Sequence, residues 1–275
     1  MKDDFKNIVS TDWLEQHLEA PDIRIIDSSW YFPQEKRNAE QEFLECHIPG
    51  ASFFDIDKIK DNGSDLPHML PLSAMFNSTV RKLGIGDGHK VVIYDGLGMR
   101  SAARLWWMFK VFGYSDVVVL DGGFPKWVKE NRSTTADITE KEIRHLTIYE
   151  DKSIVADRDD VLRATKLNHC SIIDARSEGR FLGKEPEPRS GLRSGSIENS
   201  INVPYETLLN KDFTFKKKQE ILDIFSQKGL VFNNYIITTC GSGVTAAVLY
   251  LALDEIGCSK ISLYDGSWAE WGKID

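Results

Sequence analysis

The cysteine at position 240 lies in a sequence that favours a reactive thiolate. A β-branched run at 235–238 predicts a buried strand before it, and apolar residues at helical spacing over 246–256 predict a helix after it. Gly241 and Gly243 let successive backbone N–H groups turn toward one point. Converging amides and the partial positive charge of a helix N-terminus stabilise S⁻ and can lower a cysteine pKa below about 8.5. We therefore expect Cys240 to be a nucleophile and not a buried structural thiol.

The spacing after Cys240 separates two kinds of thiolate chemistry. A phosphatase of the Cys-x5-Arg type needs an arginine where Ala246 stands here, because a guanidinium binds phosphate oxygens through two N–H groups. Phosphate transfer is therefore disfavoured. The loop Cys-Gly-Ser-Gly-Val-Thr instead resembles that of the rhodanese-fold sulfurtransferases, and specifically their 3-mercaptopyruvate branch.

The residues directly after the cysteine bear on the identity of the sulfur donor. In the thiosulfate branch of the family these two residues are typically basic, because they hold a doubly charged substrate. Gly241 and Ser242 carry no charge, so the resemblance favours 3-mercaptopyruvate as the substrate. The loop residues assigned to substrate binding on this basis are Gly241, Gly243, Val244 and Thr245.

Two arginines in the segment 176–191 are candidates for binding the substrate. This loop follows a predicted strand ending at Asp174, so it is expected to overhang the same sheet end as Cys240. In the mercaptopyruvate sulfurtransferases, an arginine before Phe and another closing Glu-Pro-Glu-Pro-Arg bind the carboxylate and keto groups. Both match here, as Arg180 and Arg189. Without the resemblance, surface pairing with neighbouring glutamates would be the favoured interpretation of these arginines.

Ser242, Asp57 and His68 complete the predicted catalytic set. The Ser242 hydroxyl is a candidate donor to the substrate carbonyl as negative charge grows there. The family has been proposed to use an Asp, a His and the loop Ser as a proton relay, and the resemblance assigns these roles to Asp57 and His68. Leu66-Pro67 precedes the histidine where the animal enzymes tend to have Tyr-Asp, which leaves the local partner of His68 open.

The resemblance implies a transfer of sulfane sulfur in two steps. Cys240 attacks the sulfur of 3-mercaptopyruvate, pyruvate leaves as an enolate that must be protonated, and the enzyme keeps a persulfide. Cyanide, a small thiol or a thioredoxin-type dithiol then takes the outer sulfur. No metal or organic cofactor is implied. Two alternatives stay open: a thiosulfate sulfurtransferase, from which sulfite leaves, and a persulfide carrier or regulatory module with little turnover of its own.

An internal repeat indicates how the chain positions these residues. Three motifs occur in the same order in both halves: Ile-Ile-Asp ending at Asp27 and Asp174, x-Gly-x-Gly starting at Asp95 and Cys240, and Asp-Gly starting at Asp121 and Asp265. Each copy alternates short strands with helices, the pattern of a parallel sheet covered on both faces. We therefore predict an α/β fold of two tandem rhodanese-like domains at 1–136 and 159–275, joined by a linker at 137–158.

The two copies differ at the position of the nucleophile, where the first copy has Asp95. A carboxylate is a poor acceptor of sulfane sulfur, so the first domain is predicted to be non-catalytic. It either supplies one wall of the active site from across the interface or is a structural remnant, and the sequence favours neither interpretation.

The bulk composition argues against several other classes of function. A net charge of −8 leaves no basic stripe for nucleic acid. No apolar segment approaches the roughly 20 residues of a membrane span, and the segment Met1–Phe5 is unlike a secretory or transit signal. The four cysteines show neither zinc-site nor disulfide spacing. We expect a soluble, cytoplasmic protein that binds neither nucleic acid nor membrane.

Overall fold

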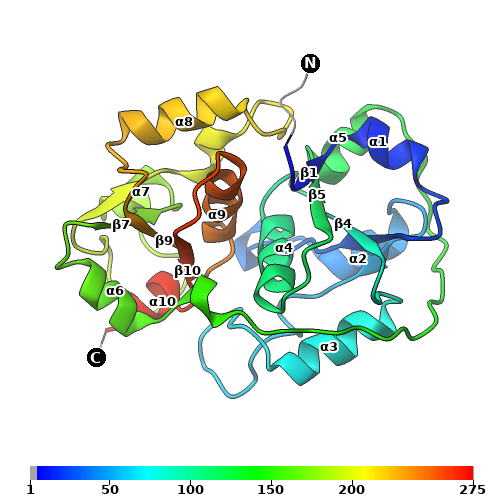
Figure 1. Cartoon of the computed structure of the whole chain (residues 1–275), viewed down its shortest axis with the longest axis horizontal. Helices are drawn as coiled ribbons and strands as arrows, with labels where there is room; N and C mark the ends of the chain where they lie inside the picture. Colours follow the sequence, from blue (N-terminus) through cyan, green and yellow to red (C-terminus); the bar gives the residue numbers. More distant parts are fainter. Residues whose placement is uncertain (1–4, 275) are drawn as a thin grey trace.

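The computed structural model describes residues 5–274, which form two α/β domains lying side by side (Figure 1). The interpretation of the segment Met1–Phe5 therefore falls mostly outside the described residues. Each domain has one five-stranded sheet, with strand orders β1-β5-β4-β2-β3 and β6-β10-β9-β7-β8, and all pairs are parallel. Because the two orders are equivalent strand for strand, the predicted fold class and the repeat are confirmed.

The first sheet and its helices are contributed by the first half of the chain. The strands are β1 (Ile8–Val9), β2 (Ile23–Asp27), β3 (Ser52–Phe53), β4 (Lys90–Tyr94) and β5 (Val117–Leu120). The helices are α1 (Thr11–Gln16), α2 (Ala39–Glu45), α3 (Ser73–Lys82), α4 (Ser101–Val111) and α5 (Gly123–Lys129).

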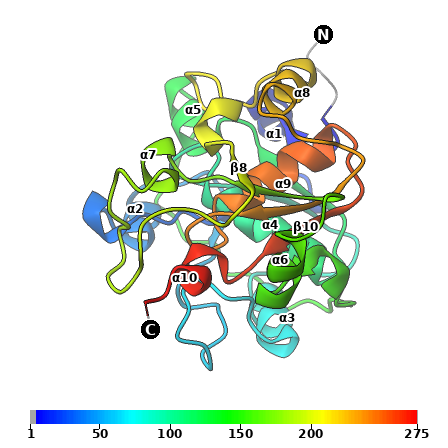
Figure 2. The ribbon, with the colours of Figure 1, turned by 90° about the vertical axis from the view of Figure 1, so that its left-hand side faces the viewer.

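The second sheet repeats this arrangement, and Figure 2 views its domain with α8 and α6 at opposite sides of the strands. The strands are β6 (Val155–Ala156), β7 (Cys170–Asp174), β8 (Ser200–Asn202), β9 (Tyr235–Thr239) and β10 (Ile261–Tyr264). The helices are α6 (Arg158–Ala164), α7 (Glu178–Phe181), α8 (Lys218–Gln227), α9 (Ala246–Glu255) and α10 (Ser267–Trp271).

Alternating residues of each central strand pack against different helical layers. In β9, Ile236 belongs to the large core that contains α8 and α9, whereas Ile237 packs with residues of α6 and α10. In β4, Ile93 faces the core that contains α3 and α4, and Val92 faces residues of α1, α2 and α5. Helices therefore cover both faces of both sheets, as expected for parallel sheets.

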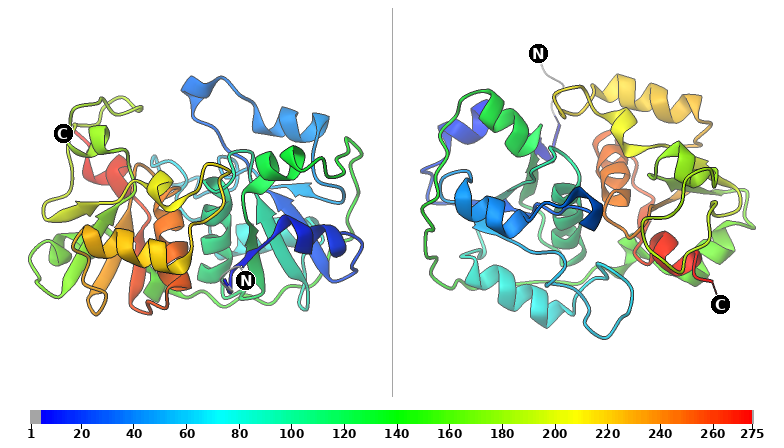
Figure 3. Two further views of the ribbon diagram at one scale, coloured as in Figure 1. Left: turned by 90° about the horizontal axis from the view of Figure 1, so that it is seen from above. Right: turned by 180° about the vertical axis from the view of Figure 1, so that it is seen from behind.

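The two domains share one hydrophobic core across their interface. Helices α4 and α9 lie against each other between the sheets (Figures 1 and 3), and nearly all their residues are buried. The rings of Trp106 and Tyr250 meet here with centroids 6.0 Å apart. Each of these helices begins directly after the x-Gly-x-Gly loop of its own domain, so the interface brings both loops close to the other domain.

The segment between the domains runs along the surface in extended form. Leu146 is buried in the shared core, Ile148 packs against it, and Ile143 is exposed. The second sheet takes up Val155–Ala156, which the sequence analysis placed in the connecting segment. Within residues 5–274, no helix is both long and apolar enough to cross a bilayer.

Candidate active site

Cys240 follows β9 at the carboxyl edge of the second sheet and is only 2% exposed. The loop after it is held from behind by Ser267, whose hydroxyl oxygen accepts hydrogen bonds from the amides of Cys240 at 3.2 Å and Gly243 at 3.1 Å. The Gly243 amide therefore points away from the reaction side. Gly243 is not among the residues that line the cavity described below, and its assignment to substrate binding stays a prediction.

Both glycines of the loop are needed because arginines pack directly against them. A Cβ at Gly241 would lie 2.9 Å from Nη2 of Arg180, and one at Gly243 would lie 2.9 Å from Nη1 of Arg104. Gly243 also has φ +76°, a left-handed conformation that favours glycine. The neighbouring arginines favour glycine at both positions, and the backbone conformation favours it at Gly243 as well.

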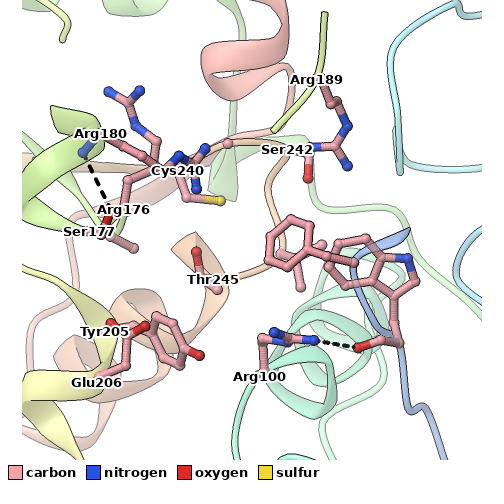
Figure 4. Close-up of a pocket in the computed structure, with 15 residues that line it drawn as sticks. Arg100, Arg176, Ser177, Arg180, Arg189, Tyr205, Glu206, Cys240, Ser242 and Thr245 are labelled. Carbon is pink, nitrogen blue, oxygen red and sulfur yellow. Dashed lines mark hydrogen bonds between the residues drawn. The ribbon is translucent and has the colours of Figure 1, made fainter. Parts of the chain in front are cut away.

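The Cys240 loop forms the floor of a cavity of about 550 Å³ (Figure 4). Both domains contribute to its walls. The lining residues are Trp30, Phe32, Arg100, Ala175, Arg176, Ser177, Arg180, Arg189, Tyr205, Glu206, Cys240, Gly241, Ser242, Val244 and Thr245. Since three of them come from the first domain, that domain supplies a wall of the site and is no mere remnant.

The two predicted substrate-binding arginines both line this cavity, but their surroundings differ. Arg180 donates to Glu187 through Nη2 at 2.6 Å, and Glu187 also accepts from Nη1 of Arg176 at 2.8 Å. The Glu187 side chain is only 2% exposed, so this is a buried cluster and not a surface pair. Arg176 is in turn held by Asp174, which lies at the end of β7. Arg180 is therefore fixed in place before any substrate binds.

Arg189 has no carboxylate within ion-pair distance among residues 5–274. Its guanidinium lies beside Ser242 (Figure 4) and also lines a second cavity of about 560 Å³ that contains Asp57 and His68. Burial lowers the pKa of Arg189, and the nearby Cys240 thiolate opposes that change. Arg189 is thus a half-buried cation whose natural counter-charge is a bound anion.

The three residues of the predicted proton relay form one hydrogen-bonded chain across the domain interface. The Nδ1 atom of His68 lies 3.0 Å from Oγ of Ser242, and Nε2 lies 2.9 Å from Oδ1 of Asp57. A carboxylate can only accept, so neutral His68 carries its proton on Nε2 and leaves Nδ1 to accept from the serine hydroxyl. The partner of His68, which the sequence left open, is Asp57.

Burial and hydrogen bonding act in opposite directions on this chain. Burial lowers the pKa of His68, and this effect outweighs the hydrogen bond and charge of Asp57, which raise it. For Asp57, burial alone would raise the pKa, but the hydrogen bond and charge of His68 lower it below the usual value. The neutral imidazole beside an ionised carboxylate can therefore accept a proton and be stabilised as it does so.

Trp30 belongs to the site but was not found from the sequence. Its Nε1 donates to Oδ2 of Asp57 at 2.8 Å, and its ring contacts the His68 ring edge-on with centroids 4.7 Å apart. Arg100, on the same wall, donates to the Trp30 carbonyl at 2.9 Å and to Glu35 at 2.8 Å. Neither Trp30 nor Arg100 lies in a recognisable sequence motif. Their only signal in the sequence is that Trp30 follows β2 and Arg100 follows β4, at the edge of the sheet that faces the site.

The equivalent loop of the first domain contains its own anion. Oδ1 of Asp95 accepts from the Leu97 amide at 2.8 Å, and Oδ2 accepts from the amides of Arg100 at 2.7 Å and Ala102 at 2.8 Å. The carboxylate thus occupies the anion-binding loop that Cys240 occupies in the second domain. This gives a structural reason for the predicted lack of chemistry in the first domain.

Sequence and structure comparisons agree with this architecture. A model of the rhodanese-like domain matches residues 10–130 and 157–274. Mouse 3-mercaptopyruvate sulfurtransferase is 38% identical, over 97% of this chain and 92% of the relative. Rat thiosulfate sulfurtransferase is 39% identical with the same coverage of both chains. The structure of SseA, a 3-mercaptopyruvate sulfotransferase of Escherichia coli, superposes with a TM-score of 0.87 at 39% identity, covering 96% of this chain and 99% of that one.

Two α/β domains with parallel sheets, of which the second carries the buried Cys240 in the loop before a buried helix, define a thiol-dependent sulfurtransferase. The chain belongs to the rhodanese family, in the form with two tandem domains of which the second carries the cysteine. The family resemblance found in the sequence is thereby confirmed.

Proposed function

We propose that this sulfurtransferase moves sulfane sulfur from 3-mercaptopyruvate to a thiol or to cyanide through a persulfide on Cys240. The observation that carries this proposal is the hydrogen-bonded chain from Ser242 through His68 to Asp57, next to Cys240 and to Arg189, a half-buried arginine without a carboxylate partner among residues 5–274. A donor whose leaving group needs a proton makes use of such a chain. Thiosulfate does not need it, because sulfite is already a stable anion.

Substrate binding rests on the two arginines with different surroundings. Arg189, which has no carboxylate partner among residues 5–274, binds the carboxylate of 3-mercaptopyruvate. Arg180, already fixed by Glu187 beside Gly241, donates to the keto oxygen, while the Ser242 hydroxyl stays hydrogen-bonded to His68. Val244 and Thr245 line the remaining floor of the cavity. This arrangement matches a ligand with a single negative charge and a ketone.

In the first step the Cys240 thiolate attacks the substrate sulfur. An S–S bond forms, the C–S bond breaks, and its electron pair becomes the enolate of pyruvate. The substrate thiol proton passes through Ser242 to Nδ1 of His68, where the Asp57 carboxylate stabilises the imidazolium. The same proton returns to the enolate carbon. The step therefore needs no external acid, and it leaves pyruvate and a persulfide anion.

Asp95 supports an assignment of the groups that hold this persulfide. A carboxylate oxygen and the outer sulfur of a cysteine persulfide both stand two bonds from Cβ, so the oxygens of Asp95 stand in for that sulfur in the sister loop. The loop amides that bind Asp95 include those of Leu97 and Arg100. Their equivalents are the amides of Ser242 and Thr245, which we assign to the persulfide anion.

The second step requires an acceptor that reaches a deeply placed sulfur. Since Cys240 is nearly inaccessible, the acceptor enters the cavity of about 550 Å³, which fits cyanide or a small thiol. For a thioredoxin-type protein, the exposed thiol must enter the same cavity, whose lining includes Trp30 and Tyr205. We assign the protein to the cytoplasm, because its four free cysteines fit a reducing compartment. A relative from Arabidopsis thaliana is named as mitochondrial. Subcellular fractionation of the native host would therefore test this assignment.

Intact mass spectrometry tests the proposal directly. Incubation with 3-mercaptopyruvate should add one sulfur, which peptide mapping assigns to Cys240 and which cyanide removes. Absence of added sulfur, with Cys240 still open to alkylation, would contradict the proposed reaction.

Thiosulfate remains a second candidate donor, because relatives with 39% sequence identity are named thiosulfate sulfurtransferase. Pyruvate release and sulfite release should be compared by kcat/KM. A preference for thiosulfate would reverse the assignment of the donor.

A further inference from the structure

Arg104 crosses from α4 of the first domain into the catalytic loop of the second. Its side chain is fully buried, and it forms an ion pair of 2.6 Å with Asp265, whose side chain is 5% exposed. The same guanidinium donates to the carbonyl of His68 and, at 3.4 Å, to the carbonyl of Gly243. One cation thus contacts the backbone of both the relay loop and the cysteine loop.

The backbone at His68 is held in an unfavourable conformation. Its φ is +58°, in the left-handed region that is unfavourable for a residue with a Cβ. Two residues later, the Leu70 amide donates to Oδ2 of Asp265 at 2.8 Å. The Arg104–Asp265 pair therefore holds the turn on both sides of this strained position, through the carbonyl of His68 and the amide of Leu70.

The other half of the molecule contains the same turn without the arginine. Phe213 also has a positive φ, of +64°, and the Phe215 amide donates to Oδ1 of Asp121 at 2.9 Å, as Leu70 does to Asp265. In α9, the residue at the position equivalent to Arg104 is the buried Leu249. The Phe213 turn therefore forms without an arginine at this position of α9, and the arginine is specific to the turn that carries the histidine.

We propose that Arg104 and Asp265 are a positioning pair for the sulfur-transfer reaction. They fix the His68 turn so that Nδ1 lies within hydrogen-bond distance of Ser242. This inference deepens the proposed function and rests on the relay assigned there. A buried ion pair is often close to neutral for stability when compared with a well-packed uncharged pair, so its main contribution here is the placement of the imidazole.

The pair can be removed with little change to the rest of the turn. In the double variant Arg104→Met/Asp265→Asn both charges disappear together, and the asparagine oxygen still accepts from the Leu70 amide. We expect pyruvate release from 3-mercaptopyruvate to slow by about 10- to 100-fold, within the range that loss of general acid–base catalysis produces. Sulfite release from thiosulfate and alkylation of Cys240 by iodoacetamide should change by less than about threefold, because neither uses the relay.

A double-mutant cycle with His68→Ala separates positioning from general damage. If the pair acts through His68, adding Arg104→Met/Asp265→Asn to His68→Ala causes no further loss. Multiplying losses, or an equal loss with thiosulfate, would overturn the inference. If His68→Ala is itself as fast as the wild type, the proposed relay fails, and any slowing by the double variant then has a cause other than His68.

Two further variants control for folding. Asp121→Asn changes the matching aspartate over the non-catalytic loop, and it should affect the unfolding midpoint without a selective loss of mercaptopyruvate turnover. Arg104→Lys keeps the charge opposite Asp265 but cannot pair with Asp265 and also donate to the carbonyls of both His68 and Gly243. If the double variant does not fold, Arg104→Lys should still slow pyruvate release selectively. Wild-type turnover by a folded Arg104→Lys protein would contradict the inference.

Discussion

The guanidinium of Arg180 lies 2.6 Å from the Glu187 carboxylate and stands directly over the Cα of Gly241. The glutamate is almost completely buried and also holds Arg176, so it fixes two guanidinium groups on one side of the cysteine. Arg180 is therefore held in a fixed orientation, whereas Arg189 has no carboxylate partner among residues 5–274 to fix it.

The first prediction concerns this glutamate. Glu187→Gln removes the charge that holds Arg180 and leaves two partly uncompensated cations, which should cost about 3 kcal/mol in the free energy of unfolding. The KM for 3-mercaptopyruvate should rise because Arg180 is no longer fixed. Urea unfolding and steady-state kinetics measure the two effects, and a stable variant with unchanged KM would contradict this role.

A second prediction separates the two arginines. Arg189→Ala should lower kcat/KM for 3-mercaptopyruvate by about 10- to 100-fold, the range expected when a hydrogen-bonded charge pair worth about 1.5–3 kcal/mol is lost. Arg180→Ala should weaken catalysis as well, but it should also reduce stability because Glu187 loses a partner. Alkylation of Cys240 by iodoacetamide should stay roughly intact in both variants. A collapse of alkylation would mean that the arginines support the thiolate or the fold instead.

The close approach of Arg180 to the loop gives a third prediction. In Gly241→Ala the new Cβ would meet Nη2 at 2.9 Å, so the guanidinium must move away. We expect a higher KM for 3-mercaptopyruvate with a folded protein. Gly63→Ala is the matched control, because its Cβ would meet only a flexible aspartate oxygen at 3.3 Å. Equal kinetic effects of both substitutions would rule out the steric explanation.

The buried imidazole of His68 gives a prediction about pH. Its pKa is lowered by burial below the unfolded value near 6.5, so the unfolded chain binds the proton more readily than the folded one. Stability from the neutral imidazole is therefore complete above about pH 6.5 and decreases as the pH falls below it, by at most about 1.4 kcal/mol per pH unit. Urea unfolding between pH 7.5 and 5.5 should show a shallower loss in His68→Gln than in the wild type. Parallel curves would contradict the assignment.

Asp95 allows a prediction for the non-catalytic domain. Asp95→Ala leaves three amides, two of them buried, without their acceptor, which should lower the free energy of unfolding by about 3–5 kcal/mol. The reactivity of Cys240 toward iodoacetamide should not change. Chemical unfolding monitored by circular dichroism measures the first effect, and a variant as stable as the wild type would show that water replaces the carboxylate.

Local patterns in the sequence were sufficient for the strand, loop and helix around Cys240 but not for the short strand Val155–Ala156, which was assigned to the linker. The β-branched run before Cys240 forms β9, and the apolar spacing after it forms α9, because both patterns depend on neighbours a few residues away. The motifs repeated in both halves of the sequence predicted the second sheet. The sequence did not reveal that the Gly243 amide donates to Ser267, a residue that only the folded sheet brings near.

The parts of the site that the sequence did not reveal depend on contacts between distant segments. Trp30 meets Asp57 across two strand ends, and Arg104 meets Asp265 across the domain interface. Neither pair has a spacing that a helix or strand would impose, so no periodicity marks them. The resemblance to a known family supplied His68 and Asp57, but it did not supply the residues that hold them.

The His68 turn and the Phe213 turn both cross the domain interface, which has a consequence for the evolution of such a protein. The His68 turn covers the Cys240 loop, and the Phe213 turn packs on Gly98 in the Asp95 loop. An ancestor with one domain, paired with its own copy, would have had two identical reaction centres, each completed by the other subunit. Fusion into one chain freed the halves to specialise, but mutations in either half still affect the one remaining centre. Selection on the catalysis therefore constrains both halves of the gene, including the half that lost its nucleophile.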